Sequence, residues 1–252
     1  MDAQNLHGLY FYPDSTRTYP NSSMLSHVLG FLGHKDPNDE HLTGMDGIER
    51  SMDTYLSGQD GFRYIEHDRT GREIIVYRGQ EQSPKNGLSV QLTIDMGLQA
   101  ILEEELDNAF KELKPETLSG LIVDPKTGEI LAMSSRPTYD LNDINSAKPE
   151  QMKNRTIMDM VEPGSTFKIV VASGALNEQT ITEKTLIDCE NGHFAYGGKI
   201  LRDHHPYGMM PVHDILMKSS NIGSAKMALM MGDKKFYEYV KRYGFGDRTG
   251  IE

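Results

Sequence analysis

The chain has 252 residues with 26 basic and 37 acidic side chains, which gives a formal net charge of −11. An acidic balance of this kind argues against a role in coating nucleic acid, which needs a basic surface. Hydrophobic residues make up 37% and charged residues 25%, so we expect a folded chain of one large domain, or one domain and part of another. Cys189 is the only cysteine, so an internal disulfide and a cysteine-rich zinc site are both excluded.

The sequence contains no pattern typical of targeting or membrane insertion. Residues 1–5 are polar, and no basic segment followed by an apolar one comes after them, as a signal peptide would require. No stretch approaches the roughly 18–20 apolar residues that span a bilayer. The most apolar run, residues 169–176, is short and is interrupted by Ser173 and Gly174.

Residues 1–87 are rich in loops, with four prolines and few periodic apolar runs. The apolar spacing over residues 48–56 predicts a short helix. Residues 62–66 and 72–77 flank a turn that predicts a β-hairpin with Gly71 in the left-handed position. The breaker residues at 83–87 are the expected boundary between two domains.

After that boundary, a strand and a long helix are expected. Apolar residues alternate over residues 88–94, which predicts the strand, and Asp95 can then cap the helix. One apolar stripe of this helix is expected to be buried, and it comprises Leu98, Ile101, Leu102, Leu106, Ala109, Phe110 and Leu113.

A tight hairpin and three more helices are expected in the rest of the chain. Two apolar runs, residues 118–123 and 129–133, are joined by a linker with proline early and glycine late, which predicts the hairpin. The helices are expected at residues 165–177, 212–231 and 233–243.

A serine and a lysine three residues apart form the most informative motif. The sequence Glu-Pro-Gly-Ser-Thr-Phe-Lys at residues 162–168 is followed by an apolar run, so a helix should begin near Ser165. Residues three apart share a helix face, which places Lys168 beside the Ser165 hydroxyl. The positive end of the helix dipole favours oxyanion character on the serine, and a partly desolvated lysine can act as a base. The pair indicates a nucleophile that works without histidine, although a capping serine and a solvated lysine have the same spacing.

A second polar cluster, Ser219, Ser220 and Asn221, interrupts a methionine-rich helix pattern. Serine and asparagine are poor in helix interiors because they compete for backbone hydrogen bonds. The cluster therefore predicts either a break whose polar groups face a cleft or a simple capping cluster between two helices.

Together the two motifs resemble the S-x-x-K and S-x-N signatures of the penicillin-binding serine acyltransferases. The resemblance covers nearly the whole chain, with transpeptidase-like segments at residues 92–95, 121–133 and 154–155 and segments like the pedestal, or dimerisation, domain of class B penicillin-binding proteins at residues 17–20, 47–49 and 55–58. The approach to Ser165 from Asp159 is closer to the division-specific septal type than to the elongation type.

The resemblance implies a fold that is α/β in the broad sense, or α+β. Residues 1–87 would form part of a loop-rich β pedestal. Residues 88–252 would form the first part of a transpeptidase domain related to serine β-lactamases.

The resemblance also implies a peptidoglycan D,D-transpeptidase and a role for each motif residue. Ser165 would attack a D-Ala carbonyl of a stem peptide, and its own N–H would form half of the oxyanion hole. Lys168 would take the Ser165 proton, and Ser219 would relay a proton to the leaving or attacking amine. Asn221 would hold the substrate amide and Lys168 in place. No metal or organic cofactor is implied.

A third family motif, K-[ST]-G, is expected much further along the chain than S-x-N. Residues 126–128 spell Lys-Thr-Gly, but they precede Ser165 and are expected to form a hairpin turn, with Gly128 where positive φ is needed. No K-[ST]-G follows Asn221 in the 31 residues that remain. We therefore expect the chain to be an internal fragment of a longer transpeptidase, truncated at both ends.

The implied partners are peptidoglycan stem peptides, β-lactam antibiotics and other proteins of cell division and cell-wall synthesis. The parent would be held in the bacterial inner membrane with this part on the extracytoplasmic side, although the chain itself lacks the anchor. Two alternatives stay open: a non-catalytic scaffold with the penicillin-binding fold, and a serine β-lactamase, which would lack the pedestal. The histidines at 204, 205 and 213 are expected to be exposed loop residues. The methionines at 209, 210, 217, 227, 230 and 231 are expected to be core packing.

Overall fold

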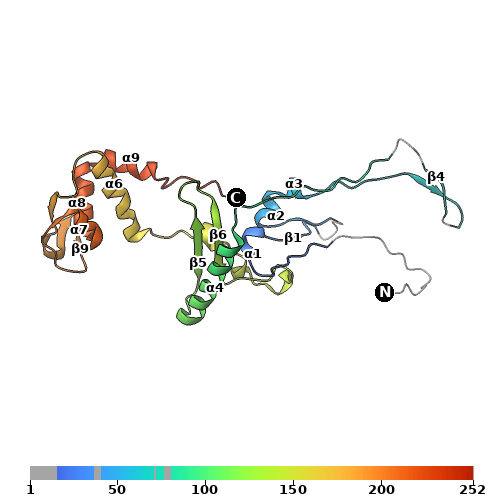
Figure 1. Ribbon diagram of the computed structural model, residues 1–252, viewed down its shortest axis with the longest axis horizontal. Helices are drawn as coiled ribbons and strands as arrows, with labels where there is room; N and C mark the ends of the chain where they lie inside the picture. The colour runs from blue at the N-terminus through green and yellow to red at the C-terminus, as the bar shows by residue number, and fades with distance from the viewer. Residues whose placement is uncertain (1–15, 37–40, 71, 77–80, 252) are drawn as a thin grey trace. The chain divides into compact units, whose positions relative to one another are not determined.

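The computed structural model describes residues 16–36, 41–70, 72–76 and 81–251, which divide into two compact units. Unit 1 ends at Asp159, and unit 2 runs from Met160 to Ile251. Both mix helices with antiparallel strand pairs, as expected for an α/β fold in the broad sense (Figure 1). None of the helices in the described ranges combines the length and apolarity needed to cross a membrane.

Short elements make up the first half of unit 1. They are α1 (Ser26–Leu29), β1 (Leu32–Gly33), β2 (Thr43–Gly44), α2 (Gly47–Ser51), α3 (Asp53–Leu56), β3 (Ile65–His67) and β4 (Glu73–Val76). The helix expected over residues 48–56 is split at Met52, where φ is −107° and ψ is 10°. The expected hairpin is confirmed as the antiparallel pair β3–β4, while Gly71 lies outside the described residues.

The second half of unit 1 is a helix packed on a hairpin (Figure 1). Its elements are α4 (Met96–Leu113), β5 (Leu118–Val123), β6 (Ile130–Arg136), the 3₁₀ turns η1 (Ile144–Ser146) and η2 (Pro149–Gln151), and α5 (Arg155–Met158). Asp95 caps α4 by accepting from the Leu98 N–H, as predicted. The expected apolar stripe is buried only in part, because Ile101 and Leu113 are 58% and 70% exposed.

The prediction of a strand at residues 88–94 is wrong, because these residues form no strand in the structure. The edge of β6 that such a strand would pair with is already occupied. Gln99 of α4 uses its side-chain amide to accept from the Met133 N–H and to donate to the Met133 carbonyl. The Asp95 N–H donates to the Leu131 carbonyl, and the Thr93 hydroxyl donates to the Ile130 carbonyl. The alternation of apolar residues could not reveal that hydrogen bonds from Gln99, Asp95 and Thr93 replace the backbone ladder of a paired strand.

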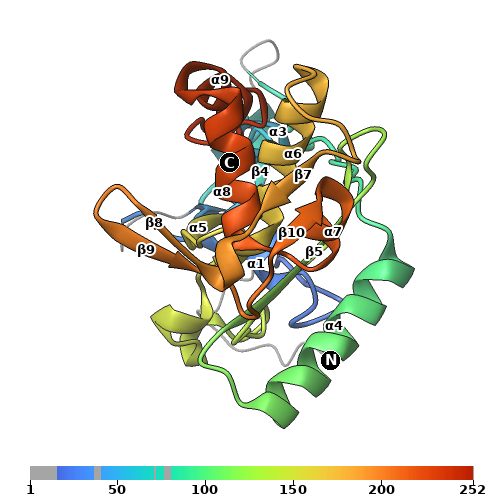
Figure 2. The same cartoon turned by 90° about the vertical axis from the view of Figure 1, so that its left-hand side faces the viewer.

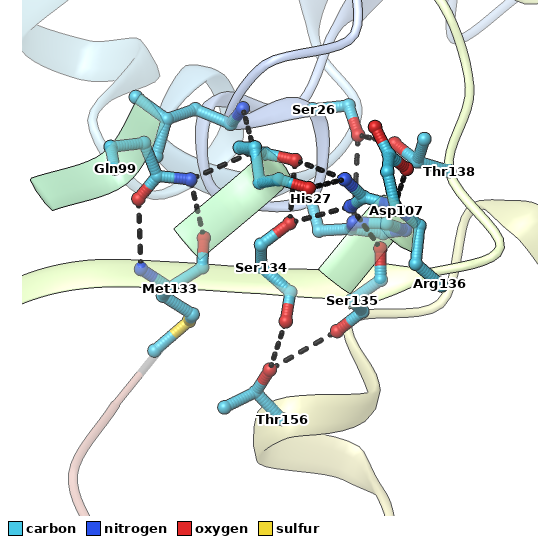
Figure 3. A network of polar contacts seen from close by, with 12 residues as sticks. Ser26, His27, Gln99, Asp107, Met133, Ser134, Ser135, Arg136, Thr138 and Thr156 are labelled. Atoms are coloured by element: carbon cyan, nitrogen blue, oxygen red, sulfur yellow. Dashed lines mark hydrogen bonds and ion pairs between the residues drawn. The ribbon is translucent and has the colours of Figure 1, made fainter. Parts of the chain in front are cut away.

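A buried polar network ties these elements of unit 1 together (Figure 3). The Arg136 guanidinium, 4% exposed, forms ion pairs with Glu103 and Asp107 of α4 and donates to Ser134. A buried arginine needs such partners because an uncompensated charge in the interior is costly. Arg136 therefore fixes α4 against β6.

Unit 2 consists of four α-helices, two 3₁₀ turns and two strand pairs. Its elements are η3 (Gly164–Phe167), α6 (Lys168–Asn177), β7 (Leu186–Asp188), η4 (Glu190–Gly192), β8 (His193–Tyr196), β9 (Lys199–Arg202), β10 (Met209–Pro211), α7 (Val212–Met217), α8 (Asn221–Met231) and α9 (Asp233–Arg242). Strand β7 pairs with β10 and β8 with β9, both antiparallel. Figure 2 shows α8 and α9 beside α6, with the β8–β9 hairpin projecting from the helices.

The core of unit 2 lies between α6 and α8. It includes Val170, Ala175, Ile215, Ile222 and Met227, each no more than 2% exposed. The start of α8 approaches α7 so closely that a Cβ on Gly223 would lie 2.6 Å from the Ile215 side chain. The helices expected at residues 165–177 and 233–243 are confirmed, and the pattern over 212–231 forms two helices with a break at the polar cluster.

We expect the Gln99→Leu variant to lose about 1–3 kcal/mol of unfolding free energy in unit 1. The substitution leaves the buried N–H and carbonyl of Met133 without partners, and unsatisfied buried groups carry a penalty of that order. Urea unfolding and hydrogen exchange at the Met133 amide would measure the loss. Lys126→Ala, in the exposed turn of the β5–β6 hairpin, is the control and should stay within about ±0.5 kcal/mol. Equal effects of the two changes would contradict the role of Gln99.

We expect the stability of unit 1 to decline in mild acid because of His27. Its ring is 5% exposed, and its Nε2 donates to the Gln151 carbonyl at 2.6 Å. Burial lowers the pKa of His27 below the ordinary value of 6.5, although the Gln151 carbonyl opposes this. The unfolded chain therefore binds the extra proton first, so stability is full above about pH 6.5 and falls as pH drops toward the folded pKa.

Thermal unfolding between pH 7.5 and 5 would test this expectation for His27. The slope with pH should flatten in His27→Gln and persist in His34→Gln, since His34 is exposed in the same unit. An unchanged slope in His27→Gln would assign the acid sensitivity to other groups.

Candidate active site

Ser165 stands in the first turn of a helix, as the sequence predicted. The 3₁₀ turn η3 holds Ser165 and continues directly into α6, which begins at Lys168. Such turns are common at the start of α-helices, and here residues three apart remain on one face. Ser165 is exposed, while Lys168 is partly buried.

The amine of Lys168 joins the two sequence motifs. Its Nζ lies 3.3 Å from the Ser165 hydroxyl, 2.8 Å from the Ser219 hydroxyl and 2.6 Å from the Ser219 carbonyl. The Ser219 hydroxyl in turn donates to the Ser165 Oγ at 2.9 Å. The first motif and the second, 54 residues apart, thus meet in one hydrogen-bonded group.

The break between α7 and α8 presents Ser219. The Ser219 N–H bonds to the Leu216 carbonyl and the Ser220 N–H to the Ile215 carbonyl, which is the Schellman pattern of a helix C-terminus. Ser219 occupies the left-handed position of this pattern with φ of 58°, where glycine is usual. Ser220 then caps α8 by accepting from the Gly223 N–H. The predicted break is confirmed.

Asn221 is the first residue of α8 and lines the same pocket as Lys168. Its side-chain amide donates to the Arg202 carbonyl at 2.9 Å, whereas the described bonds of Lys168 go to the two serines. Ser219, rather than Asn221, is therefore the residue of the second motif that holds the amine.

Partial burial changes the acidity of Lys168. Desolvation lowers its pKa from the ordinary value of 10.5, because a charge loses hydration there. The negative charge of Asp203 acts in the opposite direction and favours the protonated amine. A lysine lowered in this way is better suited to accept a proton near neutral pH.

A pocket of about 430 Å³ opens beside Lys168. Its walls come mainly from apolar residues of η3, α6, α8 and α9, with Tyr196 of the β8–β9 hairpin at one side. A mostly apolar pocket lined by a few polar groups is typical of a small-molecule site.

Asp203 is the residue at this site that sequence reasoning missed. The sequence analysis assigned it no role and expected only the neighbouring His204 and His205 to be exposed, which both are. Asp203 itself is partly buried and accepts from the Ser220 hydroxyl. No local pattern marks a residue 16 or more positions before the motif that it contacts.

The Lys-Thr-Gly sequence at residues 126–128 forms the turn between β5 and β6 in unit 1, as predicted. Gly128 has φ of 80°, and Lys126 is exposed. Among the described residues, no group of three or more histidine, cysteine or acidic side chains is arranged to hold a metal ion.

Comparisons with known proteins place the chain in a family. Residues 118–252 match the model of the penicillin-binding protein transpeptidase domain, and residues 1–92 match that of the penicillin-binding protein dimerisation domain. The chain belongs to the penicillin-binding protein family, and the sequence resemblance to its class B members is confirmed.

Curated relatives and a solved structure agree with this assignment. Stage V sporulation protein D of Bacillus subtilis is 36% identical over 255 residues, covering 100% of this chain and 38% of its own length. Peptidoglycan D,D-transpeptidase FtsI of Escherichia coli is 34% identical over 246 residues, covering 98% and 40%. The crystal structure of penicillin-binding protein 2X from Streptococcus thermophilus aligns with a TM-score of 0.75 at 30% identity, covering 90% of this chain and 35% of that one. The chain thus spans about two fifths of the length of these relatives.

Proposed function

We propose that the protein is a serine-type peptidoglycan D,D-transpeptidase of the septal type and that Ser165 is its nucleophile. The observation that carries the proposal is the hydrogen-bonded group of Ser165, Lys168 and Ser219, in which Lys168 also lines a pocket. The similarity to FtsI supports the substrate, a stem peptide ending in D-alanine, and β-lactams would occupy the same place.

The donors around the amine suggest how Lys168 acts as the base. As an ammonium ion it has three N–H groups for the three oxygens around it. As a neutral amine it keeps two N–H donors for Ser219 and turns its lone pair to the Ser165 hydroxyl. Ser165 Oγ then bonds to the carbonyl carbon of the penultimate D-alanine while its proton passes to Lys168.

The remaining steps use the same groups. The tetrahedral intermediate collapses when the bond to the terminal D-alanine breaks, and that amine takes the proton through the Ser219 hydroxyl. An amine of a second stem peptide attacks the acyl-enzyme and its proton passes through the Ser219 hydroxyl to Lys168. The bond from the acyl carbon to Ser165 Oγ then breaks, and Lys168 returns the proton to Ser165. The Ser165 N–H supplies one oxyanion donor, and Asn221 holds the substrate amide.

The proposal extends to domains, partners and location. Residues 1–87 would be part of the pedestal domain and 88–252 part of the transpeptidase domain; the two matching family models support this order. Division and cell-wall synthesis proteins would be partners, and the parent would be held in the inner membrane facing the periplasm.

We expect fluorescent penicillin to acylate the 252-residue chain slowly or not at all, and to label rapidly a form of the protein that carries the third motif. One oxyanion-hole donor is typically worth about 10²–10³ in rate, and the third motif is the expected source of the second donor. Gel fluorescence and intact-mass spectrometry would measure the adduct.

Ser165→Ala should abolish labelling in both forms, whereas Ser173→Ala, on the same helix, should label like the parent. Ser173 bonds to the Val170 carbonyl and the Tyr243 hydroxyl, so it serves as the matched control. Labelling that survives Ser165→Ala would overturn the nucleophile. Rapid labelling of the 252-residue chain would show that the site is complete without the third motif.

A further inference from the structure

The carboxylate of Asp203, just after β9, accepts three hydrogen bonds from the start of α8. Its Oδ2 accepts from the Ser220 hydroxyl at 2.6 Å. Its Oδ1 accepts from the N–H groups of Asn221 and Ile222 at 2.5 and 3.1 Å. Both oxygens are therefore directed at the segment that carries the second motif.

These bonds complete the N-terminus of α8. The first N–H groups of a helix have no partners within it, and they favour a nearby negative charge. The Ser220 hydroxyl accepts from the N–H of Gly223, and the Asp203 carboxylate accepts from those of Asn221 and Ile222. Because Ser220 is only 1% exposed, its hydroxyl depends on protein partners such as Asp203.

The position of Ser219 depends on this arrangement. Its left-handed backbone persists only if neighbouring contacts hold it. On one side Ser219 and Ser220 bond back to α7, and on the other Ser220 is fixed to Asp203. Ser219 in turn offers its carbonyl and hydroxyl to Lys168. A chain of contacts thus links Asp203 to the amine through Ser220 and Ser219.

We propose that Asp203 is a positioning residue that holds Ser219 and Asn221 in place and that its negative charge acts on the Lys168 amine. Its significance for catalysis rests on the proposed function, but its hold on Lys168 can be measured without catalysis. A helix cap with no further role would contribute stability alone.

The charge contribution has a defined sign. Asp203 raises the pKa of Lys168 against the effect of burial, so removing the carboxylate should let that pKa fall further. Other titratable groups lie around Asp203 and the Lys168 pocket. They are Asp188 of β7, Cys189 and Glu190 in the following turn, Lys226 of α8, His204 and His205 in the loop after Asp203, and Asp233 on the pocket wall. Among the charged groups, only Asp203 shifts the pKa of Lys168 resolvably.

Two variants separate the charge from the geometry. Asp203→Asn keeps an oxygen acceptor and a similar shape but loses the charge, whereas Asp203→Ala loses both. Asp188→Asn is the matched control, because Asp188 is exposed, lies in the same unit and accepts from the Glu190 N–H instead of from α8.

The first readout uses the 252-residue chain and needs no activity. Lysine labelled with ¹³C at Cε is titrated by NMR, and the Lys168 signal is assigned with Lys168→Arg. The Lys168 midpoint should move to lower pH in Asp203→Asn and stay unchanged in Asp188→Asn. An unmoved midpoint in Asp203→Asn would overturn the electrostatic part of the proposal.

The second readout is the rate of penicillin acylation against pH in a form that carries the third motif. The rate should rise with pH as Lys168 loses its proton. In Asp203→Asn this rise should begin at lower pH. In Asp203→Ala the plateau should fall about 10- to 100-fold, as expected when reacting groups are slightly misplaced. Circular dichroism verifies that each variant is folded.

The two proposals fail in different ways. If Ser165→Ala abolishes labelling while both Asp203 variants keep the parental plateau and pH profile, Asp203 is only a cap and the nucleophile stands. If Ser165→Ala still labels, the proposed function fails, and the NMR titration alone decides whether Asp203 controls Lys168.

Discussion

The hydrogen bonds of one lysine amine hold the candidate site together. Lys168 bonds to Ser165, in the turn that leads into α6, and to Ser219, 51 residues further along the chain. The site therefore exists only when α6 and the α7–α8 break are correctly packed. The apolar core between α6 and α8 supplies that packing. The chemistry and the stability of unit 2 therefore depend on the same contact between helices.

The parts of the fold that the sequence predicted are those decided by neighbouring residues. The cap at Asp95, the turn at Gly128 and the spacing of Ser165 and Lys168 are all local, and the structure contains each of them. The break at Ser219 was predictable for the same reason, since polar residues in a helical pattern favour a helix end.

The parts that the sequence could not predict depend on partners distant in the chain. Residues 88–94 alternate like a strand, but Gln99 of α4 occupies the edge of β6 with which a strand would pair. Asp203 likewise had no role in the sequence analysis, because its partners are the distant amides at the start of α8. Side chains that replace backbone ladders or cap remote helices leave no periodic pattern in the sequence.

Ser219 shows where function departs from what stability alone would select. A Schellman turn favours glycine at the position of Ser219, and a side chain in the left-handed region costs about 1–2 kcal/mol. Glycine there would remove the hydroxyl that bridges Lys168 and Ser165. The bonds that Ser220 makes to Ile215 and to Asp203 offset this strain, because they fix the turn from both sides. The unfavourable residue and its supporting bonds are therefore best understood as one device, in which a strained turn keeps a reactive side chain in a single place.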